Sequence, residues 1–298
     1  MHKSGFVNII GKPNVGKSTL MNALVGERMS IITAKPQTTR HRIIGILSGD
    51  DFQIVFSDTP GLVKDPSYRM HLMMNRFVHS TFEDADVLCL VTEPTEVPEP
   101  DNPLLEKIRN VTTPRFLVMN KMDQHDEHTV RQQMDAWSAL APFEERFAIS
   151  ALQQTHTQDL LNKILEYLPE GPAYYPKDQL TDRPERFFVS EIIREHVLNL
   201  YEQEIPYSTE VTIESFKETT TVKGEPLIKI AATLYVARKS QKNILIGKEG
   251  RAIKTLGTHA RQALETFLES KIFLELHVKV KENWRDDDRS LQSFGYQN

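Results

Sequence analysis

The chain has 298 residues, a length that predicts two domains, each large enough to bury a core. Hydrophobic residues make up 39% and charged residues 26% of the sequence, and the net charge is −5, as in ordinary globular proteins. No run of about 18 apolar residues and no apolar leader segment occur, so we expect a cytoplasmic protein without a membrane-spanning helix. The only cysteine, Cys89, excludes an internal disulfide and is expected to be buried and inert, and the ten histidines lack the spacing of a zinc site.

A phosphate-binding loop is the first motif in the chain. The sequence G-x-x-x-x-G-K-S from Gly11 to Ser18 lies between an apolar strand candidate at 6–10 and a helix candidate at 19–25. Its glycines let successive N–H groups point at one polyphosphate near the helix N-terminus. We expect Lys17 to reach the β- and γ-phosphates and Ser18 to bind a magnesium ion that bridges them. The residues of this loop expected to hold the nucleotide are Gly11, Lys12, Pro13, Asn14, Val15, Gly16, Lys17, Ser18 and Thr19.

A loop and a hairpin follow. Residues 29–42 have no clear periodicity and predict a mobile loop, and strands are expected at 43–47 and 52–56 around a hairpin signal. The second strand leads to the sequence D-T-P-G. Asp58, at the C-terminal end of a strand close to the phosphate loop, is placed to bind magnesium through water, and the Gly61 N–H can reach the γ-phosphate.

The remainder of the first half alternates strands and helices, which favours a parallel sheet covered on both faces. Strands are expected at 87–91, 116–119 and 146–149, and helices at 66–83, 104–109 and 159–168, with a Pro-rich loop at 94–103. Core packing explains the methionine-rich apolar stripe of the 66–83 helix.

The sequence N-K-M-D at 120–123, directly after a predicted strand, indicates a guanine site. An ionised aspartate only accepts hydrogen bonds, so Asp123 can take two from guanine N1–H and the 2-amino group, which adenine does not offer. Asn120 would brace the loop and contact the base, and the Lys121 stem would pack over the base plane. After the next strand, backbone N–H groups at Ser150 and Ala151 could meet guanine O6. The residues expected to contact the nucleotide outside the phosphate loop are Asp58, Thr59, Pro60, Gly61, Leu62, Asn120, Lys121, Met122, Asp123, Ser150 and Ala151.

The motifs G-K-P-N-V-G-K-S, T-T-R, D-T-P-G, N-K-M-D and S-A-L, in this order and spacing, resemble the five guanine-nucleotide motifs of the translation-factor-related GTPases. They extend over residues 5–168. The resemblance implies that Thr39, directly before Arg40, closes on magnesium and the γ-phosphate when GTP is bound. Thr38 is the alternative. Lys17, Thr39 and Gly61 would then support hydrolysis.

The residue after Gly61 is Leu62 and not the glutamine that orients water in Ras-like enzymes, so intrinsic hydrolysis is expected to be slow. By resemblance to other GTPases with a hydrophobic residue here, Asn14 could hold a potassium ion that acts as an arginine finger would.

The second half begins after a Pro-rich linker, expected at 169–184. A helix is predicted over 185–204 and a strand over 210–216. Two segments, 228–236 and 274–280, alternate apolar and polar residues and predict further strands. Between them we expect an apolar helix, a G-x-x-G sequence and a second helix.

The sequence Gly247-Lys-Glu-Gly250 between two helices is the arrangement of a KH domain. Glycine at both ends lets a sugar-phosphate backbone lie against the loop, while the neighbouring helix and strand grip about four unstacked bases. The surroundings are basic, since Arg238 to Arg261 contains seven basic residues and one acidic residue. The residues expected to contact RNA are Ile244 and Ile246 in the floor of the base groove, Gly247, Gly250, and the phosphate-binding Lys248, Arg251 and Lys254.

A GTPase domain followed by this KH domain is similar to the Era family over essentially the whole chain, including the segments at 181–183, 190–195 and 284–287. The expected fold is an α/β P-loop NTPase with a mostly parallel, doubly wound sheet at 1–168, followed after the linker by an α+β type II KH domain at 185–298.

The resemblance implies a GTP-hydrolysing switch that binds 16S rRNA near its 3′ end and assists assembly of the small ribosomal (30S) subunit. Its cofactors would be GTP or GDP and Mg²⁺, held by Ser18, Thr39 and Asp58, with K⁺ as a further candidate. We expect a monomer and no DNA partner. Peripheral contact with the cytoplasmic face of the inner membrane is implied by the resemblance alone.

Two other functions fit parts of the pattern. In a membrane-associated or cell-division signalling GTPase, the basic patch would meet anionic lipid, which needs no glycine pair between helices. An RNA-modifying or RNA-cleaving enzyme would need a reactive cluster in residues 185–298. Asp286 to Asp288 is the only candidate, and a solvated terminus explains it better.

Overall fold

A computed structural model describes residues 1–63 and 65–296 of the chain. The described chain divides into two compact units. Unit 1 comprises Met1 to Asp65 and Met74 to Asp182, and unit 2 comprises Pro66–Met73 and, to the end of the described chain, Arg183 to Tyr296. The segment expected as a linker over 169–184 therefore lies almost wholly in unit 1, and a short segment of the first half belongs to unit 2.

Unit 1 is built on a six-stranded sheet in the order β2-β3-β1-β4-β5-β6. Its strands are β1 (Lys3–Ile10), β2 (Ile43–Ser48), β3 (Phe52–Asp58), β4 (Val87–Thr92), β5 (Arg115–Met119) and β6 (Glu145–Ala148). The edge strand β2 is antiparallel to β3, and all other neighbours are parallel. The mostly parallel, doubly wound sheet expected from the sequence is confirmed.

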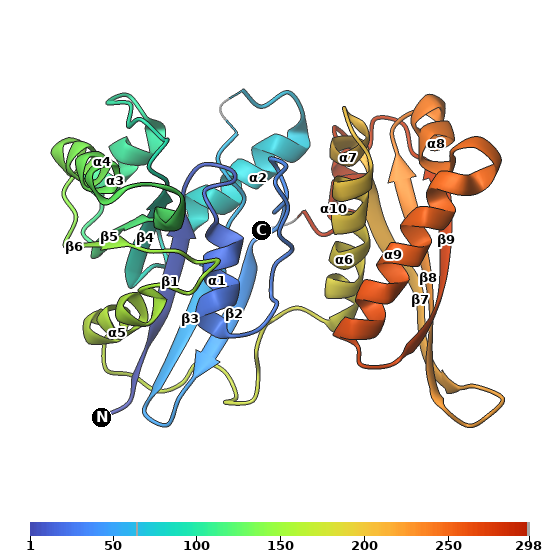
Figure 1. Ribbon diagram of the computed structural model, residues 1–298, viewed down its shortest axis with the longest axis horizontal. Helices are drawn as coiled ribbons and strands as arrows, with labels where there is room; N and C mark the ends of the chain where they lie inside the picture. Colours follow the sequence, from blue (N-terminus) through green and yellow to red (C-terminus); the bar gives the residue numbers. More distant parts are fainter. Residues whose placement is uncertain (64, 297–298) are drawn as a thin grey trace. The chain divides into compact units, whose positions relative to one another are not determined.

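Helices cover both faces of this sheet. They are α1 (Lys17–Val25), α2 (Arg69–Ser80), α3 (Pro103–Asn110), α4 (Glu127–Leu140) and α5 (Thr157–Tyr167), with the 3₁₀ turn η1 at Met122–Gln124. Figure 1 shows α1 and α5 in front of the strands and α2 behind them. Apolar side chains of α3 and α4 form one core cluster with β4 and β5. In β4, burial raises the pKa of the Cys89 thiol to about 12, which agrees with the inert role expected for it.

The helix α4 was not predicted. Asp126 caps its N-terminus by accepting a hydrogen bond from the Thr129 N–H, and only Val130 and Trp137 are buried along it. Such a narrow apolar stripe in a mostly polar segment gives little periodic signal, and the helix is fixed by the face of the sheet that it covers.

The segment 169–182 follows the surface of unit 1 through hydrogen bonds at several points. The Ser4 N–H donates to Pro169 O over 3.1 Å, and the Ile46 N–H of strand β2 donates to Leu180 O over 2.8 Å. Between these points, Gln53 Oε1 accepts from the backbone N–H groups of Tyr174 and Tyr175. This length of chain is tied to the sheet and does not act as a free spacer.

Unit 2 combines a three-stranded sheet with a layer of helices. The strands are β7 (Glu210–Thr220), β8 (Pro226–Val236) and β9 (Lys271–Val280), and the helical segments are α6 (Glu185–Leu200), α7 (Ile205–Ser208), α8 (Lys239–Ile246), η2 (Lys248–Gly250), α9 (Arg251–Phe267) and α10 (Asp288–Ser293). In the order β7-β8-β9, the first pair is antiparallel and the second parallel. This is the α+β arrangement expected of a type II KH domain.

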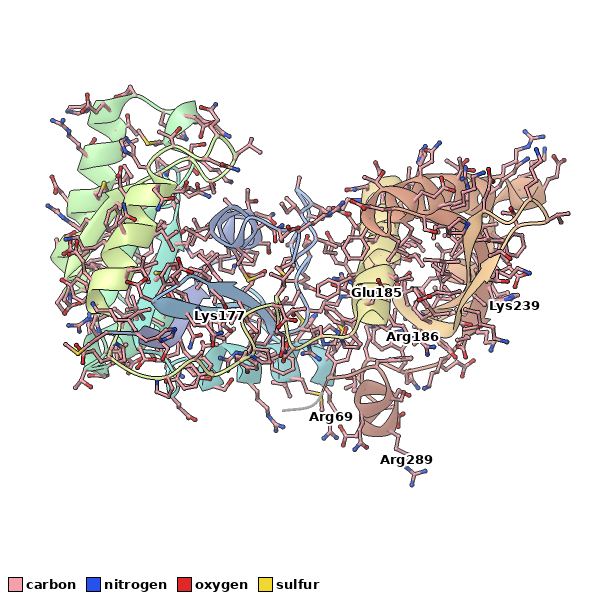
Figure 2. The ribbon with its side chains drawn as sticks, turned by 90° about the horizontal axis from the view of Figure 1, so that it is seen from below. Arg69, Lys177, Glu185, Arg186, Lys239 and Arg289 are labelled. Atoms are coloured by element: carbon pink, nitrogen blue, oxygen red, sulfur yellow. The ribbon has the colours of Figure 1, made fainter. Side chains whose placement is uncertain are left out.

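The core of unit 2 lies between one face of its sheet and the helices α6, α8 and α9. The C-terminal segment packs on the same unit, because Trp284 is fully buried and its indole N–H donates to Ser208 O over 3.0 Å. Asp287 caps α10 by accepting from the Ser290 N–H, and Asp288 pairs with Arg69. Figure 2 shows Arg289 of α10 pointing away from the unit. Asp286 accepts from the Arg69 N–H over 3.0 Å, so structural roles account for all three aspartates at 286–288.

Candidate functional site

The phosphate loop connects the end of β1 to the start of α1. Gly16 precedes α1 with a φ of 93°, in the left-handed region, and a Cβ there would lie 2.2 Å from Asn120 Nδ2. Only glycine fits this position, because both the backbone angle and the space exclude a side chain. The loop that would hold phosphate is thereby packed directly against the loop expected to hold guanine.

Three oxygen-bearing side chains meet beside this loop. Ser18 Oγ donates to Asp58 Oδ2 over 2.6 Å and lies 2.9 Å from Thr39 Oγ1, which in turn is 3.4 Å from Asp58 Oδ2. Asp58 is fully buried, and its other oxygen, Oδ1, has no hydrogen-bond partner in the described structure. A buried carboxylate oxygen without a partner, next to two hydroxyls, fits the oxygen ligands that Mg²⁺ prefers.

The two threonines in question lie in different surroundings. Thr39 is buried and belongs to the cluster with Ser18 and Asp58. The Thr38 hydroxyl instead donates to Lys35 O over 2.6 Å and lies 2.6 Å from Thr33 Oγ1. Of the two residues left open by the sequence, Thr39 is the one placed to reach a metal ion at Ser18.

Lys17, the first residue of α1, is buried. Its Nζ donates to Lys12 O over 2.8 Å, and burial lowers its pKa from 10.5 to about 8 although Asp58 and Glu96 act in the opposite direction. Burial also raises the pKa of Asp58, against the attraction of Lys17 and hydrogen bonds that include one from Ser18. Both ionised groups are held out of water, so each gains from an ion of opposite sign in the site.

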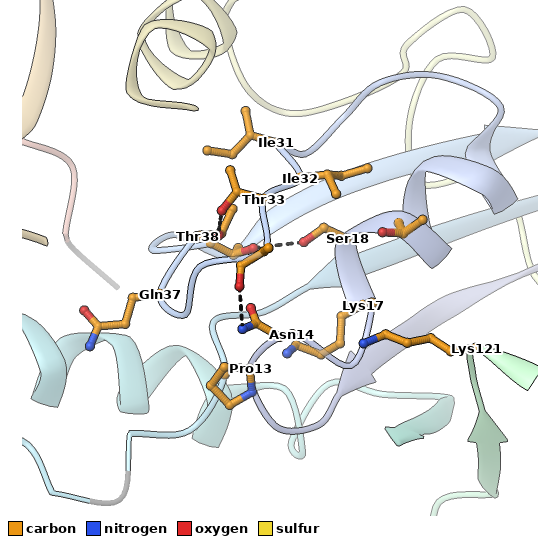
Figure 3. A pocket seen from close by; sticks show the side chains of 15 residues that line it. Pro13, Asn14, Lys17, Ser18, Ile31, Ile32, Thr33, Gln37, Thr38 and Lys121 are labelled. Carbon is orange, nitrogen blue, oxygen red and sulfur yellow. Dashed lines mark hydrogen bonds between the residues drawn. The ribbon is translucent and has the colours of Figure 1, made fainter. Parts of the chain in front are cut away.

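A cavity of about 330 Å³ opens above the phosphate loop (Figure 3). It is lined by Pro13, Asn14, Gly16, Lys17, Ser18, Thr19, Ile31, Ile32, Thr33, Ala34, Gln37, Thr38, Thr39, Gly61 and Lys121. Its lining includes nine of the residues predicted to hold nucleotide or metal. It also includes Ile31, Ile32, Thr33, Ala34 and Gln37 of the loop 29–42, for which the sequence predicts no individual role. Asn14 links the phosphate loop to the loop 29–42, since its Nδ2 donates to Ala34 O over 3.0 Å.

The N-K-M-D loop follows β5 and leads into η1. Asn120 is buried and links three segments, because its Nδ2 donates to Val15 O over 2.9 Å and its Oδ1 accepts from the Ala151 N–H over 2.9 Å. Asn120 therefore braces this loop, as predicted. Ser150, also buried, accepts from the Gln153 N–H and fixes the turn after β6.

Asp123 is exposed and lies outside the lining of the cavity. Gln153 Nε2 lies 3.5 Å from Asp123 Oδ2, which is longer than an ordinary hydrogen bond. The Asp123 carboxylate is therefore available to a ligand. Lys121 lines the cavity and forms an ion pair with Glu93. The polar groups expected to recognise guanine therefore lie beyond the phosphate end, at the C-terminal edge of β5 and β6.

In unit 2, the G-x-x-G sequence forms the bend between α8 and α9. Gly247 ends α8 with φ 72° and ψ 173°, a conformation restricted to glycine, and a Cβ there would lie 2.6 Å from Ala252 Cβ. Gly250 has φ 73°, but a Cβ there would meet nothing within 4 Å. Gly247 is thus needed for the fold of the bend, whereas Gly250 leaves an open surface.

The residues expected to contact RNA gather around this bend. Lys248, Arg251 and Lys254 are exposed, and Arg251 pairs with Glu249 over 2.6 Å. Ile244 is half exposed, at 50%, whereas Ile246 is partly buried against the core. The bend therefore presents cations and one apolar side chain to solvent, a surface suited to a single strand.

These two units define the class of the protein, a P-loop GTPase joined to a KH domain. The family model for 50S ribosome-binding GTPases matches residues 6–121, and the KH domain model matches residues 204–285. The chain belongs to the Era family of GTPases. It is 46% identical over 297 residues to GTPase Era of Clostridium kluyveri, covering 99% of this chain and 100% of the relative. To GTPase Era of Syntrophus aciditrophicus it is again 46% identical, covering 99% and 96%.

Two solved structures resemble the whole chain. A crystal structure of Era in complex with MgGDPNP and nucleotides 1506–1542 of 16S ribosomal RNA has a TM-score of 0.93 and 36% identity, covering 100% of both chains. A variant of Aquifex aeolicus Era bound to GDP and AlF₄⁻ has a TM-score of 0.91 and 36% identity, covering 99% of this chain and 100% of the other.

Proposed function

We propose that unit 1 binds GTP or GDP with Mg²⁺ and hydrolyses GTP. The phosphates would lie against the loop 11–18 and Lys17, and Mg²⁺ would be held by Ser18, Thr39 and, through water, Asp58. The convergence of these three oxygens next to an unpartnered Asp58 Oδ1 supports this assignment. Gly61 would meet the γ-phosphate, and Asp123 would select guanine. K⁺ at Asn14 is a further part of this proposal.

We also propose that unit 2 binds 16S rRNA near its 3′ end, with the bases over Ile244 and Ile246 and the phosphates at Lys248, Arg251 and Lys254. The observation that carries this proposal is the Gly247 to Gly250 bend, whose open side at Gly250 admits a nucleic-acid backbone. The RNA in the related Era structure supports the choice of ligand. GTP would regulate this binding during assembly of the 30S subunit.

The protein would act in the cytoplasm as a monomer, and DNA is not expected as a partner. Among the described residues no helix is long and apolar enough to cross a membrane. Any contact with the inner membrane would therefore be peripheral, through the basic surface of unit 2. The alternative, a signalling GTPase whose basic patch meets lipid, is not favoured, because the glycine bend has no use in lipid binding.

Direct binding tests this function. The wild-type chain should bind a single-stranded RNA of the 16S 3′-terminal sequence more tightly than a scrambled RNA or anionic vesicles. Gly250→Asp, which places a negative charge on the open side of the bend, should lose RNA binding and keep GTP binding. Lys17→Ala should lose GTP binding and keep the fold of unit 2. Equal affinity for the two RNAs, or preference for vesicles, would refute the assignment.

A further inference from the structure

In the described part of unit 2, the helices α6, α8 and α9 cover one face of the sheet. Ile228, Ile230, Ala232, Leu234 and Val236 of β8 point into the core beneath α6, α8 and α9. On the other face, Phe294 of the C-terminal segment covers the end near Tyr235, with the two ring centroids 5.2 Å apart. The rest of that face, which we call the open face, carries Lys217, Lys229, Ala231, Phe273, Glu275 and His277, whereas Lys279 lies beside Tyr235 at the covered end.

One row across the open face combines two cations and an aromatic ring. Lys217 of β7 lies opposite Lys229 of β8, and Lys229 lies opposite Phe273 of β9. Like charges directly opposite each other on neighbouring strands destabilise a sheet. In the part of the chain that the structure describes, Lys217, Lys229 and Lys279 form no ion pair, whereas Lys271 at the strand end pairs with Glu225. The row therefore works against the stability of the free protein.

Phe273 adds an unused apolar surface at this place. Its side chain is 50% exposed in the middle of a strand, flanked on its own strand by Lys271 and Glu275. An exposed ring on a sheet can stack on a base of any kind, and adjacent lysines can neutralise the phosphates on either side of that base. Glu275 stands opposite Ala231 in the next row, and among the described residues no ion pair joins it to Lys217 or Lys229.

We propose that the open face is a second contact surface for single-stranded RNA, distinct from the G-x-x-G bend. Phe273 stacks on one base, and Lys217 and Lys229 bind the flanking phosphates and relieve their mutual repulsion. This inference rests on the proposed RNA-binding function of unit 2, and it adds a surface on the opposite side of the sheet from α8 and α9. A lipid surface fits less well, because one ring on a flat strand offers little apolar area for insertion.

The test compares RNAs of two lengths. An oligonucleotide of about four nucleotides fills the bend alone, and one of about 20 exceeds what a single small fold occupies. Phe273→Ala should weaken binding of the long RNA by about 5- to 150-fold, the loss expected for one stacked base, and leave the short RNA unaffected. Lys229→Glu should weaken the long RNA further and, by creating an opposite-charge pair with Lys217, preserve or raise thermal stability.

Lys223→Glu is the matched control, because it changes the charge equally at the exposed β7–β8 turn, outside the open face. A loss of long-RNA affinity in Lys229→Glu no larger than in this control, with Phe273→Ala unchanged, would overturn the second surface. Gly250→Asp with the short RNA tests the bend separately, so the proposed function can stand when the open face fails. Loss of binding to anionic vesicles instead of RNA in Phe273→Ala would assign the face to lipid and reject the proposal.

Discussion

Ser18 and Asp58, 40 residues apart in sequence, are joined by a hydrogen bond of 2.6 Å from Ser18 Oγ to Asp58 Oδ2. Ser18 lies in the first turn of α1 and Asp58 ends β3, so the bond connects two elements whose positions are fixed by the sheet. A metal ion at this point would find its oxygen ligands already gathered, with little reorganisation. The proposed magnesium site is in this sense built by the fold.

Nucleotide binding should depend on pH through Lys17. The pKa of Lys17 is lowered to about 8 by burial, and phosphates raise it again by stabilising the cation. Above pH 8 binding must therefore take up a proton, and affinity for GTP should fall as pH rises. Calorimetry at about pH 8.5 in buffers of different ionisation enthalpy measures this uptake. Lys17→Met should bind weakly and without proton uptake; an unchanged uptake in that variant would contradict the assignment.

Lys17 should also make the stability of the nucleotide-free protein depend on pH, and this dependence should have the opposite sign to that of nucleotide binding. Between pH 8 and 10.5 the unfolded chain keeps the Lys17 proton that the folded chain has lost, so the free energy of unfolding should rise with pH. Denaturant unfolding across this window measures the slope, and Lys17→Met should reduce it.

Guanine selection should depend on Asp123. In Asp123→Asn one acceptor becomes a donor, so GTP should bind more weakly and xanthosine triphosphate more tightly. Because Asp123 is exposed, the change in preference should be smaller than the ~10⁴-fold seen at fully buried sites. Competition binding measures it, with Asp178→Asn, an exposed aspartate in the same unit, as the control. An unaltered preference for GTP would exclude Asp123 as the base reader.

Potassium should accelerate hydrolysis through Asn14. Its amide nitrogen is engaged with Ala34 O, and no hydrogen bond to its Oδ1 is recorded in the described chain, so this oxygen is the atom left to bind a cation. Turnover should be higher in K⁺ than in Na⁺ at matched ionic strength, and Asn14→Ala should lose the difference. Equal rates in the two salts would remove potassium from the mechanism.

The two glycines of the bend should respond differently to substitution. Gly247→Ala forces a side chain toward Ala252 in a backbone conformation that only glycine adopts, and should cost on the order of 1–3 kcal/mol of stability. Gly250→Asp meets open space, and aspartate tolerates the left-handed region, so unfolding should change little while RNA binding is lost. Denaturant unfolding of both variants decides between these roles, and comparable destabilisation would refute the distinction.

Nucleotide state and RNA binding should be coupled. If Thr39 closes on Mg²⁺ only with GTP, RNA affinity must differ between GTP-analogue and GDP forms, and RNA must shift nucleotide affinity by the same factor. The loop 29–42 is the candidate two-state element, and Thr39→Ala should abolish the difference while Thr38→Ala retains it. Measuring RNA affinity in both states gives the answer; equal affinities would leave two independent modules on one chain.

The proximity of the candidate nucleotide-site motifs was largely predictable, because four of the five are short, contiguous and come at the end of a strand of the sheet, T-T-R before β2 being the exception. Parallel strands bring their C-terminal ends to one edge of the sheet. Motifs that follow successive strands in the sequence therefore lie close together in space. The lining of the cavity by Ile31 to Ala34 and Gln37 was not predictable, since irregular backbone has no period. The position of Asp123 was not predictable either, because its distance from the phosphate loop depends on the η1 turn.

In unit 2 the strands and the bend were predicted from alternation and paired glycines, but the contents of the open face were not. The row formed by Lys217, Lys229 and Phe273 depends on strand register, and a β-bulge between Ile213 and Ser215 shifts that register. Sequence spacing alone cannot locate a bulge, so it cannot say which side chains stand opposite each other.

The bond from Ile46 to Leu180 has a practical consequence for anyone dividing the chain. The strand β2 is the outer edge of a largely parallel sheet, and an uncovered edge is a template for pairing with another molecule. The stretch 169–182 shields that edge. A fragment cut at residue 168 would bare the edge and invite aggregation, whereas one cut after residue 182 carries its own protection.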